Sequence, residues 1–445
     1  GAREAIDEGA VCEAELALVS GMDELSEDKY TEATLLLAES LQDQSRWSES
    51  VEALVKIGDP IEHDLVQVAE MLRSTADWKL RRMGQQEAVE RINKSLRAAS
   101  ETLSRRVRVT ALASSMILLS DTHDRQSSIE ALRYVKQIVF DLESPKERAL
   151  RAQALAMVSN FAESKVDFDA AEDAIEAAIR SYPVQSHGQA VHSLLMAQGS
   201  FKVSKGRYEE AIPVYKRALR VAEMRGSPSS VARAIANLMM SYSRVGEFGK
   251  AIELTLEGRR VATLSNDPVM FRILFYAAWS HAMVGDTDEA LKLVPTWIEG
   301  AHDAPAGWMR QACDLLASDV YYLLKRGRDG LRHARLATTG GCTLPLSRAY
   351  VGPFARAVAN VATSDHLEAG GIDRIVQVAK EFDHDLMDRA EISCAKLLLI
   401  ANLGGDPSLE ANSLRTVLLH LPSATVAGFR GLGFERALIY AAAIH

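Results

Sequence analysis

The sequence is poor in the residues that divide a chain into many tight turns. Its 445 residues include 27 glycines and 12 prolines, and aromatic residues make up only 6%. All-β sandwiches and barrels depend on many turns that favour glycine and proline, so these counts argue against them. Hydrophobic residues still make up 47% of the chain, an ordinary share for a globular protein. The core must therefore consist mainly of alanine and aliphatic side chains.

Cysteines and long apolar runs are also scarce. The four cysteines are widely spaced, at Cys12, Cys313, Cys342 and Cys394. The absence of any CxxC spacing predicts no disulfide framework and suits a reducing compartment. No apolar run approaches the roughly 18 residues of a membrane span, and acidic residues occupy the N-terminal stretch where a signal peptide would be basic. We expect a cytoplasmic protein that does not contact membranes.

Positive charge is too sparse for a dedicated nucleic-acid binder. The net charge is -9, and residues 1–70 alone hold 18 acidic and 4 basic residues, a balance of -14. The remaining residues hold 42 acidic and 47 basic residues, a balance of +5. Basic clusters at 105–108 and 325–328 lack the interleaved aromatics of a single-strand binding groove. The sequence predicts no direct binding of nucleic acid.

Motifs for catalysis, cofactors and metals are missing. The chain has no phosphate-binding loop, no HExxH, no paired cysteines and no Gly-x-Ser-x-Gly turn. Two Asp/His clusters, at 121–124 and 383–385, consist of adjacent residues, which point in different directions on a helix and seldom converge on one ion. We therefore expect no catalytic residue, no cofactor and no metal, and keep an all-helical enzyme as the less favoured alternative.

What the sequence does contain is an internal repeat. A small residue in a similar context recurs at Ala171, Ala211, Ala251 and Ala290, in steps of 40, 40 and 39 residues. Weaker copies lie upstream, at Ala33, Ala88 and Ala131. A regular period in this range is typical of a solenoid built from stacked supersecondary units.

Each unit is predicted to be a pair of amphipathic helices. In the clearest unit, a first helix spans about 187–204, Gly206 provides the turn, and a second helix starts near Tyr208. The second helix carries one apolar stripe that includes Ala211, Tyr215 and Ala218. Prolines such as Pro228 are expected at the joints between units.

These residues resemble the tetratricopeptide repeat. The matching positions are Gly199, Gly206, Tyr208, Ala211, Tyr215 and Ala218, followed by Tyr242, Gly246, Phe248 and Ala251, and then Ala278, Gly285 and Ala290. The resemblance implies an all-α, right-handed α-solenoid in which the first helix of each hairpin lines a concave groove. We expect divergent hairpins in 1–110, a regular array in 111–335, and divergent helical repeats in 336–445.

The resemblance also implies which residues line the groove. Counting along each first helix gives Asn160, Arg233, Met240, Arg244, Arg272, Phe275, Trp279 and Tyr321. Arginine, tryptophan and tyrosine are enriched in binding hot spots, and the arginines predict a protein, peptide or small anionic effector as the partner. Phe275 and Trp279, four residues apart, fit packing between neighbouring helices equally well.

Two non-catalytic functions follow. Arrays with this longer period resemble the sensor arrays of STAND-class ATPases and of LuxR-like bacterial regulators. This resemblance implies a sensor module of a larger signalling or transcriptional regulator. The alternative is a constitutive scaffold or adaptor. The apolar C-terminal stretch, 435–445, further predicts either a neighbouring domain in a longer chain or self-association through the C-terminal helices.

Overall fold

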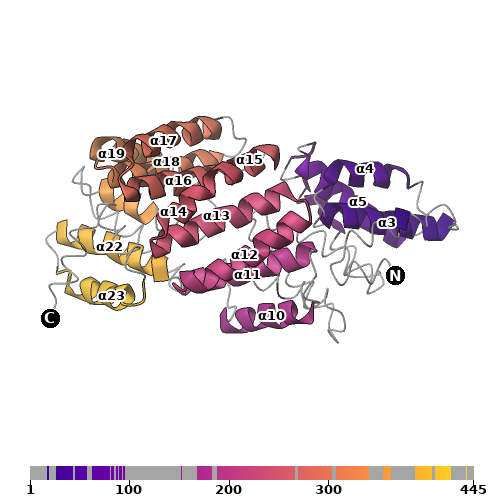
Figure 1. The fold of residues 1–445 in the computed structure, drawn as a ribbon, viewed down its shortest axis with the longest axis horizontal. Coiled ribbons are helices and arrows are strands. Elements are labelled where there is room, and N and C mark those ends of the chain that lie inside the picture. The colour runs from indigo at the N-terminus through magenta and orange to yellow at the C-terminus, as the bar shows by residue number, and fades with distance from the viewer. Residues whose placement is uncertain are drawn as a thin grey trace. The chain divides into compact units, whose positions relative to one another are not determined.

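The computed structural model describes residues 18–19, 27–43, 46–57, 63–80, 82–84, 87–88, 90–92, 94–95, 152, 168–182, 188–265, 269–302, 307–339, 354–361, 386–402, 406–421 and 437. Throughout these residues the chain forms α-helices joined by turns, with no strand (Figure 1). The predicted all-α fold is therefore confirmed. Both Asp/His clusters, the basic cluster at 105–108 and Asn160 lie outside the described residues.

The chain divides into two compact units. The first comprises Gly1–Asn160, Ser164–Gln198 and Arg217–Ser230, and the second comprises Phe161–Glu163, Gly199–Lys216 and Val231–His445. The division expected from the sequence, with boundaries near 110 and 335, stays a prediction. None of the helices that the structure describes is both long and apolar enough to cross a bilayer.

In the first unit, three helices pack around one core. They are α3 (Glu27–Asp43), α4 (Trp47–Val55) and α5 (His63–Lys79). Leucines and alanines fill the space between them, including Leu35, Leu54 and Leu72. A buried amide fixes their register, because Gln42 Nε2 donates to Ser50 Oγ at 3.0 Å and to the carbonyl of Leu72 at 2.7 Å. A further helix, α10 (Phe168–Ser181), matches the expected repeat near Ala171.

Two helices contribute to both units. They are α11 (Gln189–Ser204) and α12 (Tyr208–Met224), and their bounds agree with the predicted hairpin around Gly206. Pro213 lies inside α12.

The second unit contains most of the remaining helices. In chain order they are α13 (Pro228–Val245), α14 (Phe248–Glu253), α15 (Thr255–Ser265), α16 (Met270–Val284), α17 (Thr287–His302), α18 (Gly307–Leu323), α19 (Gly327–Thr339), an unlabelled helix at 354–361, α22 (Leu386–Asn402) and α23 (Ser408–Leu418). Pro228 begins α13, the expected place for a proline at a joint, and Pro295 lies inside α17.

The turns between first and second helices share one geometry. Gly206, Gly246 and Gly285 adopt positive φ angles of 73°, 88° and 86°. In each turn, the N–H of the next residue donates to the carbonyl five positions earlier, as Asp286 N does to His281 O at 2.8 Å. This is a Schellman-type helix end, in which glycine avoids the strain of a left-handed backbone.

A fourth turn has the same geometry without glycine. Lys325 has a φ of 57°, and Arg326 N donates to Tyr321 O at 2.8 Å. Lys325 is thus the structural counterpart of Gly285, whereas Gly327 is the first residue of α19. This placement changes which residues of α18 correspond to those of α16.

Small residues allow the two helices of a hairpin to cross closely. Ala211, Ala251 and Ala290 are fully buried near the start of their second helices, and Gly330 takes the corresponding place in α19. A Cβ on Gly330 would lie only 2.9 Å from Cδ2 of Tyr322. The recurring small residue found in the sequence is therefore a requirement of packing.

Neighbouring hairpins stack through their helices. α16 packs against its own second helix α17, against the following first helix α18, and against α14 and α15 of the preceding repeat (Figure 1). α17 also packs against α18, α18 against α19, and α22 against α23. Each helix pair thus contacts mainly its sequence neighbours, as in a solenoid.

Candidate binding face of the first helices

Most of the predicted binding residues lie on α13, α16 and α18. Arg233, Met240 and Arg244 on α13 and Arg272 on α16 are half-buried, as is Tyr321 on α18. These side chains are therefore partly accessible as a whole, although Nη1 of Arg244 is itself buried. We call the surface formed by Arg233, Met240, Arg244 and Arg272 the arginine face.

Arg272 is held by a neutral partner. Its Nη2 donates to Asn237 Oδ1 at 2.7 Å, which links α16 to α13. Asn237 itself is 7% exposed, so this contact is nearly buried. Among the described residues, Arg272 forms no ion pair with a carboxylate. Its positive charge is oriented by the amide but not neutralised by it.

The charge of this arginine acts on the buried hydroxyl of Tyr215. Tyr215 is buried on α12, and its Oη lies 3.4 Å from Ser200 Oγ on α11. Burial raises the pKa of Tyr215 to about 12, and the Ser200 hydroxyl and the charge of Arg272 oppose that rise. The Tyr215 hydroxyl thus lies within hydrogen-bonding distance of Ser200, and its pKa responds to the positive charge of Arg272.

Arg233 extends the arginine face along α13. It lies four residues before Asn237, which places both on one side of the helix. A ligand oxygen that reaches Arg272 would therefore find a second guanidinium within one turn of α13. Two arginines on adjacent first helices are a typical arrangement for recognising carboxylates.

Phe275 and Trp279 are interior residues in this structure. They are only 4% and 3% exposed, and their rings meet edge to face with centroids 5.7 Å apart. Phe275 also contacts Trp297 of α17, at 6.4 Å between centroids. With so little surface available to a ligand, both rings serve to pack α16 against its neighbours.

Arg244 covers the outer side of this aromatic cluster. Its guanidinium carbon lies 5.1 Å from the centroid of the Trp279 ring, a cation–π contact between α13 and α16. The same two helices are joined one position away by the hydroxyls of Ser243 and Ser280, at 2.9 Å. Arg244 thus packs on a buried ring, beside a hydrogen bond that joins the same two helices.

Tyr321 is part of a separate arrangement. Its ring stacks on His333 of α19 at 5.3 Å, and His333 Nδ1 lies 2.8 Å from Asp314 Oδ1. The observed turn at Lys325 makes Asp319 the equivalent of Trp279, because 285 minus 279 and 325 minus 319 both equal six. Whether Tyr321 contacts a ligand stays a prediction.

Asp319 belongs to a buried ionic cluster that the sequence did not reveal. Arg356 Nε donates to Asp319 Oδ1 at 3.0 Å, and its two terminal nitrogens pair with Asp319 Oδ2 and Glu391 Oε1. These residues come from α18, the 354–361 helix and α22, and all three side chains are at most 4% exposed. We call them the buried triad.

Opposing effects act on the ionisation of the triad. Burial raises the pKa of Asp319, and the charges of Arg356 and Arg244 oppose this rise. Burial disfavours the charged form of Arg356, but the two carboxylates more than offset it and keep its pKa raised. The guanidinium is therefore charged and locked between two acidic side chains.

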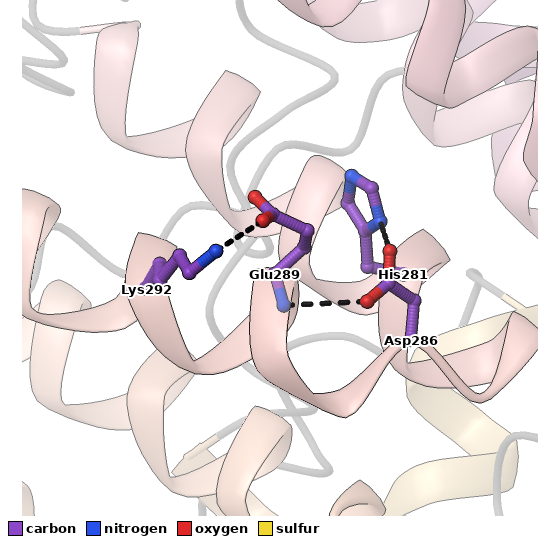
Figure 2. A network of polar contacts seen from close by, with 4 residues as sticks. All are labelled: His281, Asp286, Glu289 and Lys292. Carbon is purple, nitrogen blue, oxygen red and sulfur yellow. Dashed lines mark hydrogen bonds and ion pairs between the residues drawn. The ribbon is translucent and has the colours of Figure 1, made fainter.

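The turn between α16 and α17 shows how a hairpin end is fixed. Figure 2 shows Asp286 between His281 and the start of α17: its Oδ2 lies 3.0 Å from His281 Nδ1, and its Oδ1 accepts from Glu289 N at 3.4 Å. Lys292 pairs with Glu289 on the same helix. Asp286 thus caps α17, and His281 acts as a structural residue here.

The described residues include no group of three or more His, Cys, Asp and Glu side chains that could hold a metal ion. Cys313 and Cys394 are free and buried, and burial raises the pKa of Cys313 to about 12 and that of Cys394 well above its usual value. Both thiols are thus kept in their unreactive, protonated form.

Comparisons with known proteins agree with this architecture. A tetratricopeptide repeat family model matches residues 194–229, which span α12 and parts of α11 and α13. No curated protein sequence matches the chain. Among solved structures, the chain is similar to a Rap protein complexed with Competence and Sporulation Factor, with 14% identity, a TM-score of 0.50, and coverage of 74% of this chain and 95% of that one.

Two further solved structures resemble the chain more distantly. NprR in complex with its cognate peptide NprX has 15% identity and a TM-score of 0.49, covering 78% of this chain and 96% of that one. A monomeric IFIT1 variant with Gppp-AAAA has 10% identity and a TM-score of 0.48, covering 96% and 94%. Together with the hairpins described above, the Rap match defines the fold as a tetratricopeptide-like helical solenoid.

Proposed function

We propose that this protein is a non-catalytic binding module whose arginine face takes an acidic segment of a peptide or protein. The observation that carries the proposal is the contact between Arg272 and Asn237 at 2.7 Å. The neutral amide orients the guanidinium and leaves its charge for a ligand carboxylate, which is the group that arginine recognises best.

The composition of the face supports a peptide or protein over a small ion. Met240 supplies an adaptable apolar contact beside Arg233 and Arg244 on α13. The similar Rap structure holds Competence and Sporulation Factor, so the same fold accommodates a ligand of that kind. An extended ligand would gain affinity from several weak contacts along the first helices.

The proposal is tested with fluorescently labelled peptides of one length that range from basic to acidic. Anisotropy titrations are expected to select the acidic members. The double variant Arg233→Ala with Arg272→Ala should weaken their binding by about 2–4 kcal/mol, since both guanidinium contacts are lost.

A matched control separates specific binding from general attraction. Arg259 and Arg260 are exposed on α15, so changing both to alanine removes the same charge from another surface. This control should bind the selected peptides nearly as well as the wild type. If the two double variants weaken binding equally, or if no acidic preference is found, the arginine face is not the site.

Within this function, we favour a sensor module of a larger bacterial regulator over a constitutive scaffold. The physical basis is that stacked hairpins touch mainly their neighbours, so a ligand spanning several first helices can change their relative tilt. Small-angle scattering with and without a selected peptide distinguishes the two. A sensor should change its radius of gyration, and a scaffold should not.

A further inference from the structure

The first helices of three consecutive repeats contain no acidic residue. α11, α13 and α16 have neither aspartate nor glutamate, whereas α12, α15 and α17, which belong to the second helices, each have one or two in their first turn. The arginines and lysines of α13 and α16 are Arg233, Arg244 and Arg272. An anionic ligand on the arginine face would therefore meet no acidic side chain of α13 or α16.

Arg233 and Arg272 occupy the same position in successive repeats. Each lies 13 residues before the left-handed glycine that follows its helix, since 246 minus 233 and 285 minus 272 both equal 13. Both side chains are half-buried. The two arginines are thus related by one step of the repeat, from α13 to α16.

The equivalent position in the neighbouring first helices is uncharged. Counting 13 residues back from Gly206 and from Lys325 gives Ser193 in α11 and Ala312 in α18. Ala312 is also fully buried. The arginine position therefore recurs in α13 and α16 but not in the first helices on either side, which fits a ligand with two acidic groups better than a longer polyacidic one.

The head of Arg272 reaches back towards α13. Its Nη2 donates to Asn237 Oδ1 at 2.7 Å, and Asn237 follows Arg233 by one helical turn. The axes of packed helices are about 8–10 Å apart, whereas side chains one turn apart on a helix are separated by about 5–6 Å. The charged group of Arg272 therefore lies closer to Arg233 than the spacing between repeats alone would allow.

This spacing suits an extended peptide. In an extended chain, residues i and i+2 point to the same side and are about 6–7 Å apart, whereas adjacent residues point to opposite sides. Residues i and i+4 are about 13 Å apart, which exceeds the spacing between the two helices. A short peptide is expected to be extended, because isolated helices of fewer than about 12–15 residues are marginal in water.

We infer that Arg233 and Arg272 select an extended peptide in which two acidic residues are separated by one residue, with each carboxylate bound by one guanidinium. This inference rests on the proposed function, because it takes the arginine face as the binding site. It adds the spacing of the charges that the ligand must carry. Asn237 contributes by holding Arg272 over α13 in the orientation that the second carboxylate requires.

Three labelled peptides of identical length and composition test the spacing on the wild-type protein. Each contains two glutamates among uncharged residues, placed at i and i+1, at i and i+2, or at i and i+4. Anisotropy titrations should give at least about tenfold tighter binding for the i and i+2 peptide than for either other peptide, because only it forms both charged contacts. Equal affinities, or tightest binding of the i and i+4 peptide, would overturn the inference.

Single arginine variants test which residues read the spacing. In Arg233→Ala and in Arg272→Ala, the three peptides should bind within about twofold of one another, because one guanidinium is left to bind one carboxylate. Arg259→Ala, an exposed position on α15, is the control and should keep the preference. The readout is a ratio between peptides, so a partial loss of folded protein affects all three titrations alike. A preference that persists in Arg233→Ala or Arg272→Ala would contradict the inference.

The same titrations separate this inference from the proposed function. If acidic peptides bind better than basic ones but their spacing has no effect, the inference fails and the arginine face still stands as a binding site. If acidic peptides show no advantage over basic ones, both fail.

Discussion

The side chain of Tyr215 occupies the space that a methyl group on Gly199 would need. A Cβ at position 199 would lie 2.3 Å from Cε1 of the tyrosine ring, well inside van der Waals contact. α11 and α12 can thus cross at this point only because residue 199 has no side chain. The contact explains a glycine in a helix interior, where it is otherwise unfavourable.

Replacing this glycine should destabilise the protein. Gly199→Ala is expected to lower the free energy of unfolding by about 1–3 kcal/mol, because the ring of Tyr215 must move. Urea denaturation measures the change. Gly249→Ala is the control, since a Cβ there meets nothing within 4 Å, and it should be neutral or stabilising. Equal effects of the two substitutions would show that the close crossing is not a constraint.

Alkaline conditions should reveal the buried hydroxyl of Tyr215. Burial raises its pKa from 10 to about 12. The folded state therefore holds the proton more tightly than the unfolded state, and this stabilisation is present below pH 10 and lost as the pH rises towards 12. The loss amounts to about 2–3 kcal/mol for a shift of this size.

Tyr215→Phe isolates this contribution. The difference in unfolding free energy between wild type and variant should shrink or reverse as the pH rises from about 9 to about 11. Other titrating groups affect both proteins alike, so the difference reports on Tyr215. A difference that stays constant over this range would mean that the hydroxyl is not buried.

Removing one member of the buried triad should lower the free energy of unfolding strongly, whereas replacing all three members together should change it little. Arg356→Met leaves two buried carboxylates without a partner and should lower the unfolding free energy by about 3–5 kcal/mol. Changing all three residues to apolar ones, with Asp319→Leu, Arg356→Met and Glu391→Leu, should be close to neutral or stabilising. Denaturation of both variants checks this, and a triple variant weaker than Arg356→Met would contradict it.

The sequence was sufficient to predict the hairpin architecture. Gly206, Gly246 and Gly285 mark turns because only glycine readily adopts their left-handed backbone, and the alanines that follow are the closest points between helices. Both constraints act within each repeat, so the same residue types recur at the repeat period in the sequence. α11 accordingly ends at Ser204 and α12 begins at Tyr208, as predicted.

The register of α18 could not be predicted in the same way. Lys325 takes the left-handed position that glycine holds in the other turns, and the nearest glycine, Gly327, is already the first residue of α19. A lysine with positive φ is uncommon, and no neighbouring residue in the sequence indicates this left-handed conformation.

The burial of Phe275 and Trp279 on α16 could also not be predicted from the sequence. Phe275 and Trp279 lie on one side of a helix that packs against α14, α15, α17 and α18. When a helix is contacted on nearly every side, its apolar spacing does not identify a free face. The partners of Asp319 were hidden for a related reason, because Arg356 and Glu391 lie in a region whose repeats are too divergent to align.

The most direct test of the account is the affinity of a selected acidic peptide for Asn237→Asp. This nearly isosteric change keeps the acceptor for Arg272 but adds a carboxylate that neutralises it. Asn412→Asp, an exposed position on α23, adds the same charge elsewhere as the control. We predict that fluorescence anisotropy will show at least about tenfold weaker binding for Asn237→Asp alone, as expected for losing a charged hydrogen bond. Equal affinity of wild type and Asn237→Asp would contradict the account.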